Sequence, residues 1–121
     1  MKKITPVILI ALCLVSCYHD NEEDLYGTGS CVDPATITFA STVNGILSSY
    51  CCIGCHNGVT FSGGVNLEGW ANVRLKAIDK SLIGAITHSD GYVPMPYNLP
   101  QMSTCDINRI RAWIKAGSPN N

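Results

Sequence analysis

Cys52, Cys55 and His56 form the pattern C-x-x-C-H inside the stretch YCCIGCH. This pattern is typical of covalent attachment of c-type haem. Two thiols at this spacing can reach the two vinyl groups on one edge of a porphyrin, and the histidine that follows can ligate the iron. The pattern therefore predicts haem attachment through Cys52 and Cys55, with His56 as the proximal ligand. Cys51 leaves one alternative open, because Cys51 to His56 also fits the looser pattern C-x-x-x-C-H.

A methionine between two prolines is the candidate for the second axial ligand of the iron. Met95 lies in the segment Pro94-Met95-Pro96. Proline fixes its own backbone and forces the preceding residue into an extended conformation, so we expect Met95 outside any helix. Its thioether could then ligate iron and raise the reduction potential, which suits an electron carrier. Met102, His88 and an open iron site are the alternatives, although we expect His88 to hydrogen-bond a propionate or the backbone.

The start of the chain predicts export and a lipid anchor. Two lysines precede an apolar run over residues 4–15 that is too short for a permanent membrane span. The segment Leu14-Val15-Ser16-Cys17 resembles the lipobox of bacterial lipoproteins. This resemblance implies that residues 1–16 are removed as a signal peptide and that Cys17 is lipidated. An ordinary signal peptide is the alternative, and both place the protein outside the cytoplasm, where disulfides persist.

Residues 17–30 are polar and acidic, and we expect them to form a flexible tether between the lipid and a single domain over residues 31–121. Acidic residues directly after a lipobox also resemble the surface-export signals of some lipoproteins. We therefore expect an outer-membrane lipoprotein that faces either the periplasm or the cell exterior.

The domain after the tether is close to neutral and has no basic stripe, which excludes nucleic acid as an expected partner. Its charged residues are Asp33, Glu68, Asp79, Asp90 and Asp106 against Arg74, Lys76, Lys80, Arg109, Arg111 and Lys115.

Hydrophobic periodicity predicts an all-α domain, since no alternating strand pattern of useful length occurs. Thr38 is a reasonable N-cap for a helix that leads into the cysteine motif and ends near Tyr50. Two shorter helices follow, over residues 70–78 and from about Ser81. The last helix begins at Ser103-Thr104-Cys105-Asp106, which has the spacing of a capping box.

Taken together, these features resemble a small monohaem cytochrome c of the planctomycete type over residues 31–121. The resemblance rests on the lead-in helix, C-x-x-C-H, a glycine-rich segment, Pro94-Met95-Pro96 and the closing stretch IRAWIKAG. It implies a cytochrome c-like fold with about four short helices around one covalent haem, ligated by His56 and Met95. It also implies an electron-transfer protein rather than an enzyme, with redox proteins as partners and no small-molecule substrate. Cys51 departs from the usual pattern.

Three cysteines of the exported chain are left without a role in haem or lipid attachment, namely Cys31, Cys51 and Cys105. We expect a disulfide between Cys31 and Cys105, with Cys51 to Cys105 as the alternative. A bond between Cys51 and Cys52 would be strained and would block haem attachment.

Three other classes of protein compete with a cytochrome. A thiol-disulfide oxidoreductase could use Cys52 and Cys55, but that motif belongs near a βαβ unit. A structural zinc site could use Cys52, Cys55, His56 and Cys105, but a second paired motif is missing. A peroxidase-like haem enzyme or haem sensor needs an open distal position, and Met95 argues against one.

Overall fold

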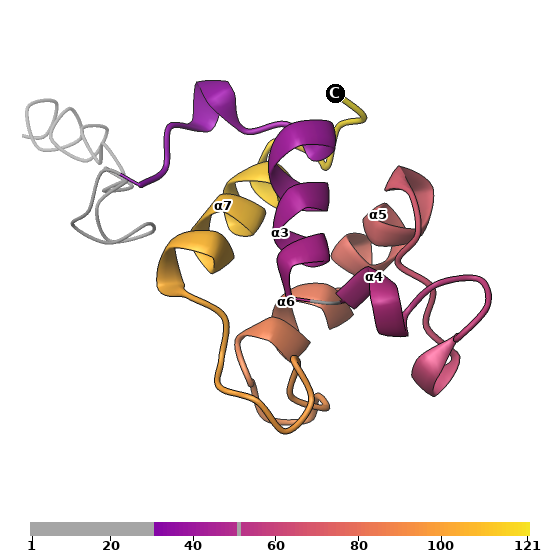
Figure 1. Ribbon diagram of the computed structural model, residues 1–121. Coiled ribbons are helices and arrows are strands. Elements are labelled where there is room, and N and C mark those ends of the chain that lie inside the picture. The colour runs from indigo at the N-terminus through magenta and orange to yellow at the C-terminus, as the bar shows by residue number, and fades with distance from the viewer. Residues whose placement is uncertain (1–30, 51) are drawn as a thin grey trace, which may run out of the picture.

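The computed structural model describes residues 31–50 and 52–121, and this part of the chain is helical without any strand (Figure 1). The expectation of an all-α domain is therefore confirmed. The elements are η2 (Pro34–Thr36), η3 (Phe39–Val43), α3 (Asn44–Ser49), α4 (Cys52–Cys55), η4 (Ser62–Gly64), α5 (Trp70–Ile78), α6 (Ser81–Ile86) and α7 (Thr104–Lys115). The expected signal peptide, Cys17, the tether and Cys51 lie outside the described residues. Within the described ranges, no helix is both long and apolar enough to cross a bilayer.

The helix before the cysteine motif begins at Thr38, as predicted, because the Thr38 side chain accepts a hydrogen bond from the backbone of Ser41 at 3.2 Å. Its first turn, η3, is a π-helix, which differs from the regular helix expected from the periodicity. The Thr38 carbonyl accepts from the backbone N–H groups of both Thr42 and Val43, which opens this turn. The chain then continues as α3 and buries one apolar face: Phe39, Val43, Ile46 and Leu47.

The closing helix α7 packs against η3 and α6 and forms the centre of the core. Trp113 is 1 % exposed, and its ring lies 5.7 Å from that of Phe39 between centroids. The chain after α7 folds back over these elements. Ser118 accepts a hydrogen bond from the Trp70 indole at 2.9 Å, and Asn121 accepts from the backbone of Phe39 at 2.8 Å. The C-terminal residues therefore connect the first, middle and last helices.

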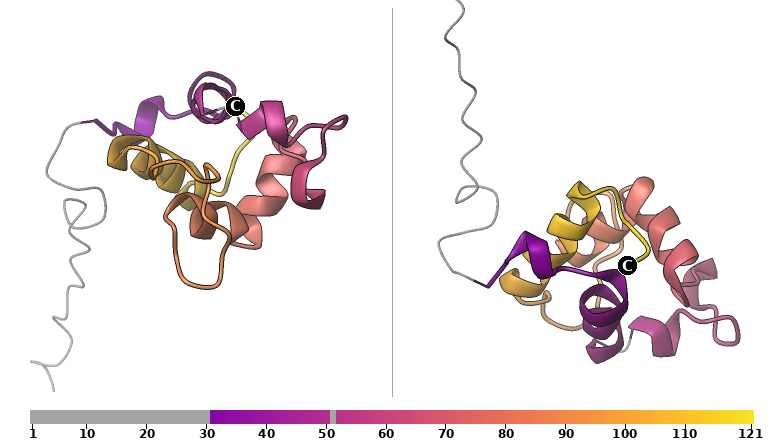
Figure 2. Two further views of the ribbon diagram at one scale, coloured as in Figure 1. Left: turned by 60° about the horizontal axis from the view of Figure 1, so that its bottom comes forward. Right: turned by 90° about the horizontal axis from the view of Figure 1, so that it is seen from above.

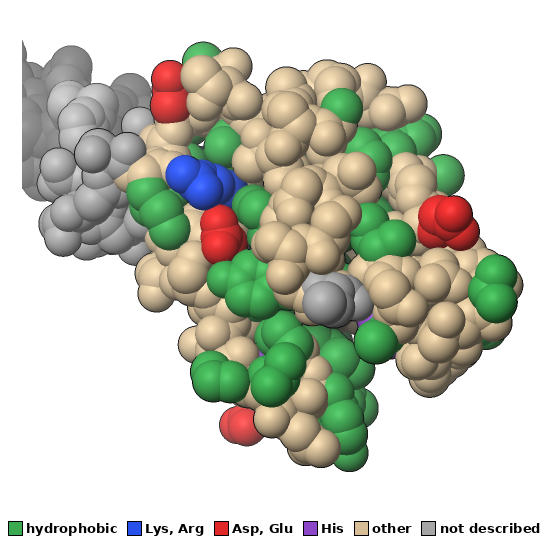
Figure 3. Space-filling model, in the orientation of Figure 1, with side chains coloured by type: hydrophobic (Ala, Val, Ile, Leu, Met, Phe, Trp, Pro, Cys, Tyr) green, Lys and Arg blue, Asp and Glu red, His purple; other side chains and the backbone are tan. Residues whose placement is uncertain are grey.

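Helices α5 and α6 pack against each other, and a long loop over residues 87–103 connects α6 to α7 (Figure 2). The loop carries Met95 outside any helix, as the flanking prolines predict. In the space-filling view, hydrophobic side chains gather over the lower part of the molecule (Figure 3), which is where this loop lies in the same orientation (Figure 1). The loop and the cysteine motif thus come from segments far apart in the sequence, and α3, α6 and α7 bring them into one domain.

Candidate functional site

The two cysteines of the C-x-x-C-H pattern lie at the two ends of α4, a short helix that is separated from the end of α3 by two residues. Residues three positions apart lie on the same face of a helix, so the motif places both sulfur atoms on one side. The backbone N–H of His56 donates to the Cys52 carbonyl at 2.8 Å, which continues the helical turn to the histidine. The motif is therefore a single helical turn that presents two thiols and one imidazole.

The His56 ring is buried, with 9 % of the residue exposed, and its Nδ1 atom lies 3.0 Å from the Ser62 carbonyl oxygen. A carbonyl oxygen can only accept a hydrogen bond, so Nδ1 carries a proton, and in the neutral imidazole Nε2 is then the nitrogen with the free lone pair. Gly63 and Gly64, which follow Ser62, have positive φ angles of 61° and 71°. Glycine adopts this conformation without steric cost, and the glycine-rich segment thereby forms the tight turn η4, whose first residue carries the carbonyl that the ring contacts. The turn fixes the tautomer that a metal-ligating histidine needs.

One cavity of about 600 Å³ brings the predicted haem-site residues together. Its walls include Cys52, Cys55, His56 and Met95. The remaining lining is mostly aliphatic and aromatic, with Leu47, Val65, Leu67, Leu82, Ala85, Ile86, Tyr92, Val93, Pro96, Tyr97 and Leu99 among it. A cavity of this size lies within the range of about 300–1,000 Å³ that is usual for ligand and cofactor sites.

The two alternatives to Met95 do not line this cavity. Met102 is 3 % exposed and belongs to the hydrophobic core instead. The His88 ring is directed to the backbone, because its Nε2 atom lies 3.1 Å from the Met95 carbonyl oxygen. Met95 is thus the only one of the three candidate ligands that the structure places at the cavity.

Among the described residues that line the cavity, Lys76 is the only lysine, arginine, aspartate or glutamate. Its ammonium group lies 3.3 Å from a carboxylate oxygen of Asp79, and Asp79 also accepts hydrogen bonds from the side chain and backbone of Ser81. Slight burial acts to raise the pKa of the Asp79 carboxyl, but the bonds from Ser81 and Lys76 outweigh it and lower the pKa below its ordinary value. Asp79 therefore stays ionised and holds Lys76 and Ser81, both lining residues, together.

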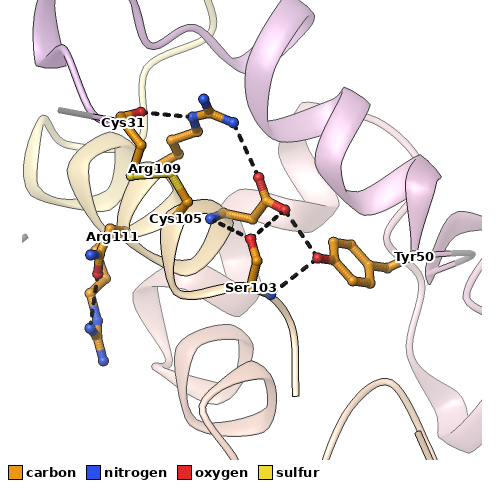
Figure 4. The surroundings of a disulfide bond; sticks show 8 residues. Cys31, Tyr50, Ser103, Cys105, Arg109 and Arg111 are labelled. Carbon is orange, nitrogen blue, oxygen red and sulfur yellow. Dashed lines mark hydrogen bonds and ion pairs between the residues drawn. A yellow bond between two sulfur atoms is a disulfide. The ribbon is translucent and has the colours of Figure 1, made fainter. Parts of the chain in front are cut away.

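Sequence reasoning missed the role of Tyr50, which joins the cysteine motif to α7 (Figure 4). The capping box that the sequence predicts is present, since Ser103 Oγ accepts from the backbone of Asp106 at 3.1 Å. In a capping box, the second bond joins the backbone N–H of Ser103 to the side chain of Asp106. Here the Tyr50 hydroxyl lies between these two groups: it accepts from the Ser103 backbone at 3.1 Å and donates to the Asp106 carboxylate at 3.0 Å. Tyr50 also lines the cavity. It thus fixes the end of α3 at the point where the chain enters the motif.

Replacing Tyr50 by Phe is expected to lower the free energy of unfolding by about 1–2 kcal/mol, because the Ser103 N–H and the Asp106 carboxylate each lose a partner. Urea denaturation of the two proteins measures the change. Tyr97→Phe is the matched control, since Tyr97 is 65 % exposed and has no hydrogen bond to another described residue. The control is expected to stay within about 0.5 kcal/mol of the wild type. Equal effects of both substitutions would contradict the bridging role of Tyr50.

Cys31 and Cys105 form a disulfide in the structure, which is the pairing that the sequence predicts, with Cys51 to Cys105 as the alternative (Figure 4). Arg109 lies beside the bond and donates to the Cys31 carbonyl at 3.0 Å. Cys105 is therefore not available as a thiolate for the alternative zinc site. Among the described residues, no group of three or more His, Cys, Asp or Glu side chains is arranged to hold a metal ion.

A second residue that sequence reasoning missed is Gly84, in the middle of α6. A Cβ atom at this position would collide with the ring carbons of Tyr92, so the glycine lets the ring pack directly on the helix. The signal in the sequence is a glycine inside a helix, which costs about 1 kcal/mol relative to alanine and so usually has a packing reason. Tyr92 lines the cavity, and Gly84 therefore helps to set the position of that wall.

Comparisons of this chain with protein-family models, with curated proteins and with solved structures found no match.

Proposed function

We propose that residues 31–121 form a monohaem c-type cytochrome with a cytochrome c-like fold that carries electrons between redox proteins. The observation that supports this most is the convergence of Cys52, Cys55, His56 and Met95 on one cavity. Cys52 and Cys55 would hold the haem through thioether bonds to its two vinyl groups. His56 Nε2 and the Met95 sulfur would ligate the iron. When bound, haem supplies reversible cycling between ferric and ferrous iron.

The chemistry of the cavity suits this cofactor. A haem presents a large apolar plate, and the cavity wall is mainly aliphatic and aromatic. A haem also carries two carboxylates, and Lys76 is the cation that lines the cavity. The Nδ1–H of His56 donates to the Ser62 carbonyl, which leaves Nε2 as the ligating atom. These residues bind and orient the cofactor, and the apolar wall keeps water from the iron.

The proposal includes export as a lipoprotein anchored at Cys17, with the acidic tether between the lipid and the domain. Both lie outside the described residues. The Cys31–Cys105 disulfide supports an oxidising compartment, since such bonds persist mainly outside the cytoplasm. We propose the outer membrane as the site of the anchor, with the domain in the periplasm or at the cell surface.

The test is the intact mass of the full chain, exported in a host that attaches c-type haem. We expect a red protein that carries the mass of one haem after acid-acetone extraction, with a reversible change between oxidised and reduced spectra. Cys52→Ala and Cys55→Ala are each expected to lose one of the two thioether bonds. Cys51→Ala is the matched control for Cys52→Ala, because it removes the neighbouring thiol and should leave both bonds intact. A wild-type protein without haem mass would overturn the proposal.

A further inference from the structure

His88 lies in the left-handed region of backbone conformation, which glycine adopts most readily and a few other residue types, histidine among them, also adopt. It directly follows Thr87, the C-cap of α6, and has a positive φ angle of 53°. The backbone N–H of His88 donates to Ala85, and that of Ser89 donates to Gly84. These two bonds define a Schellman motif, in which the residue at the position of His88 is usually glycine.

The turn at the end of α7 has the usual glycine at the equivalent position. There Gly117 has a φ angle of 91° and donates to Ile114, while Ser118 donates to Trp113. Gly117 and His88 therefore hold equivalent positions in two equivalent turns. Lys80, after α5, shows that a side chain is tolerated at such a position, with a φ angle of 65°. The backbone bonds of the turn after α6 do not involve the imidazole of His88, which makes its own contact elsewhere.

The partner of the His88 side chain is the backbone of Met95. His88 Nε2 lies 3.1 Å from the Met95 carbonyl oxygen, so Nε2 must carry the proton of this bond. On its other side, Met95 donates its N–H to the Ala85 carbonyl at 3.0 Å. Ala85 and His88 thus hold both backbone polar groups of Met95 against the end of α6.

We propose that His88 is a positioning residue that fixes the backbone of Met95 so that the thioether stays directed at the iron. This inference rests on the proposed function, because it takes Met95 as the axial ligand. His88 itself does not line the cavity and acts only through Met95. Without the bond from His88, the Met95 backbone would keep only the bond from its N–H to Ala85, and a competing ligand could displace the sulfur more readily.

The test measures how readily imidazole displaces Met95 from ferric iron in the purified haem protein. His88→Asn and His88→Gly suit the left-handed turn at least as well as histidine, but neither reaches the Met95 carbonyl. We expect each to raise the association constant of imidazole about fivefold, the factor that one lost hydrogen bond of ordinary strength produces. The charge-transfer band of methionine-ligated ferric haem should weaken in parallel. His88→Gln keeps an N–H donor at similar reach and is expected to stay within about twofold of the wild type.

The stability of His88→Gly to urea distinguishes the positioning of Met95 from a role of His88 in the helix cap alone. If His88 served only the turn, His88→Gly would stabilise the protein to urea and leave imidazole binding unchanged, which would overturn the inference. We expect instead that resistance to urea is kept while imidazole binds more tightly. A wild-type protein that carries haem but lacks the methionine band would also overturn it, whereas a protein without haem would overturn the proposed function itself.

Discussion

In the proposed haem protein, replacing Met95 by Leu is expected to open the iron to added ligands and to lower its reduction potential. Leucine has nearly the same volume as methionine, so the cavity wall is kept while the sulfur is lost. The charge-transfer band of the ferric protein should disappear, and cyanide or imidazole should bind at much lower concentration. We expect the potential to fall by on the order of 0.1 V, a part of the roughly 0.8 V range over which axial ligands set haem potentials. Spectral titration and electrochemistry measure both effects.

Met102→Leu is the matched control for this experiment. It makes the same chemical change at a methionine that is 3 % exposed and packed in the core. We expect the spectrum and potential of this variant to match those of the wild type, with a stability change below about 1.5 kcal/mol. The reverse outcome, in which Met102→Leu removes the band, would make Met102 the ligand. If neither substitution changes the spectrum, the iron lacks a methionine ligand, and the alternatives of His88 as the ligand or of an open iron site gain support.

The helix limits were predictable from the sequence because their signals are local. Thr38 and Ser103 cap the helices that they were expected to cap, since a capping residue bonds the backbone only a few positions further on. The π-helical first turn was not predicted. Its amide groups bond partly to Asn121, at the other end of the chain, and no nearby residue signals such a contact.

The residues that form the candidate site were predictable by type, but the contacts that hold them were not. The prolines beside Met95 are sufficient to keep it out of a helix, whereas the assignment of Met102 to the core depends on the packing of α7. The bridge through Tyr50 joins residues more than fifty positions apart in the chain. The need for glycine at position 84 follows only from the close contact with the ring of Tyr92. Each of these contacts depends on tertiary structure, which periodicity does not encode.

Removing the disulfide by the double substitution of Cys31 and Cys105 with Ser is expected to lower the free energy of unfolding by about 4 kcal/mol. The two cysteines are 74 positions apart, and a cross-link over a loop of this length restricts the unfolded chain by about that amount. Urea denaturation of wild type and variant at equal haem content measures the loss. Cys51→Ser is the control, because it removes a cysteine that takes no part in this disulfide.

In the same experiment, the slope of the free energy of unfolding against urea concentration shows whether the disulfide acts on the unfolded or on the native state. A disulfide that acts on the unfolded chain keeps that chain compact, so its removal should increase the surface exposed on unfolding and steepen the slope against urea. A loss of native contacts would lower stability without a steeper slope. The native contacts beside the bond are expected to persist, because Arg109 still holds the Cys31 carbonyl at 3.0 Å and the Asp106 carboxylate at 3.2 Å. A loss of less than about 1 kcal/mol with an unchanged slope would therefore show that the bond does not restrict the unfolded state in solution.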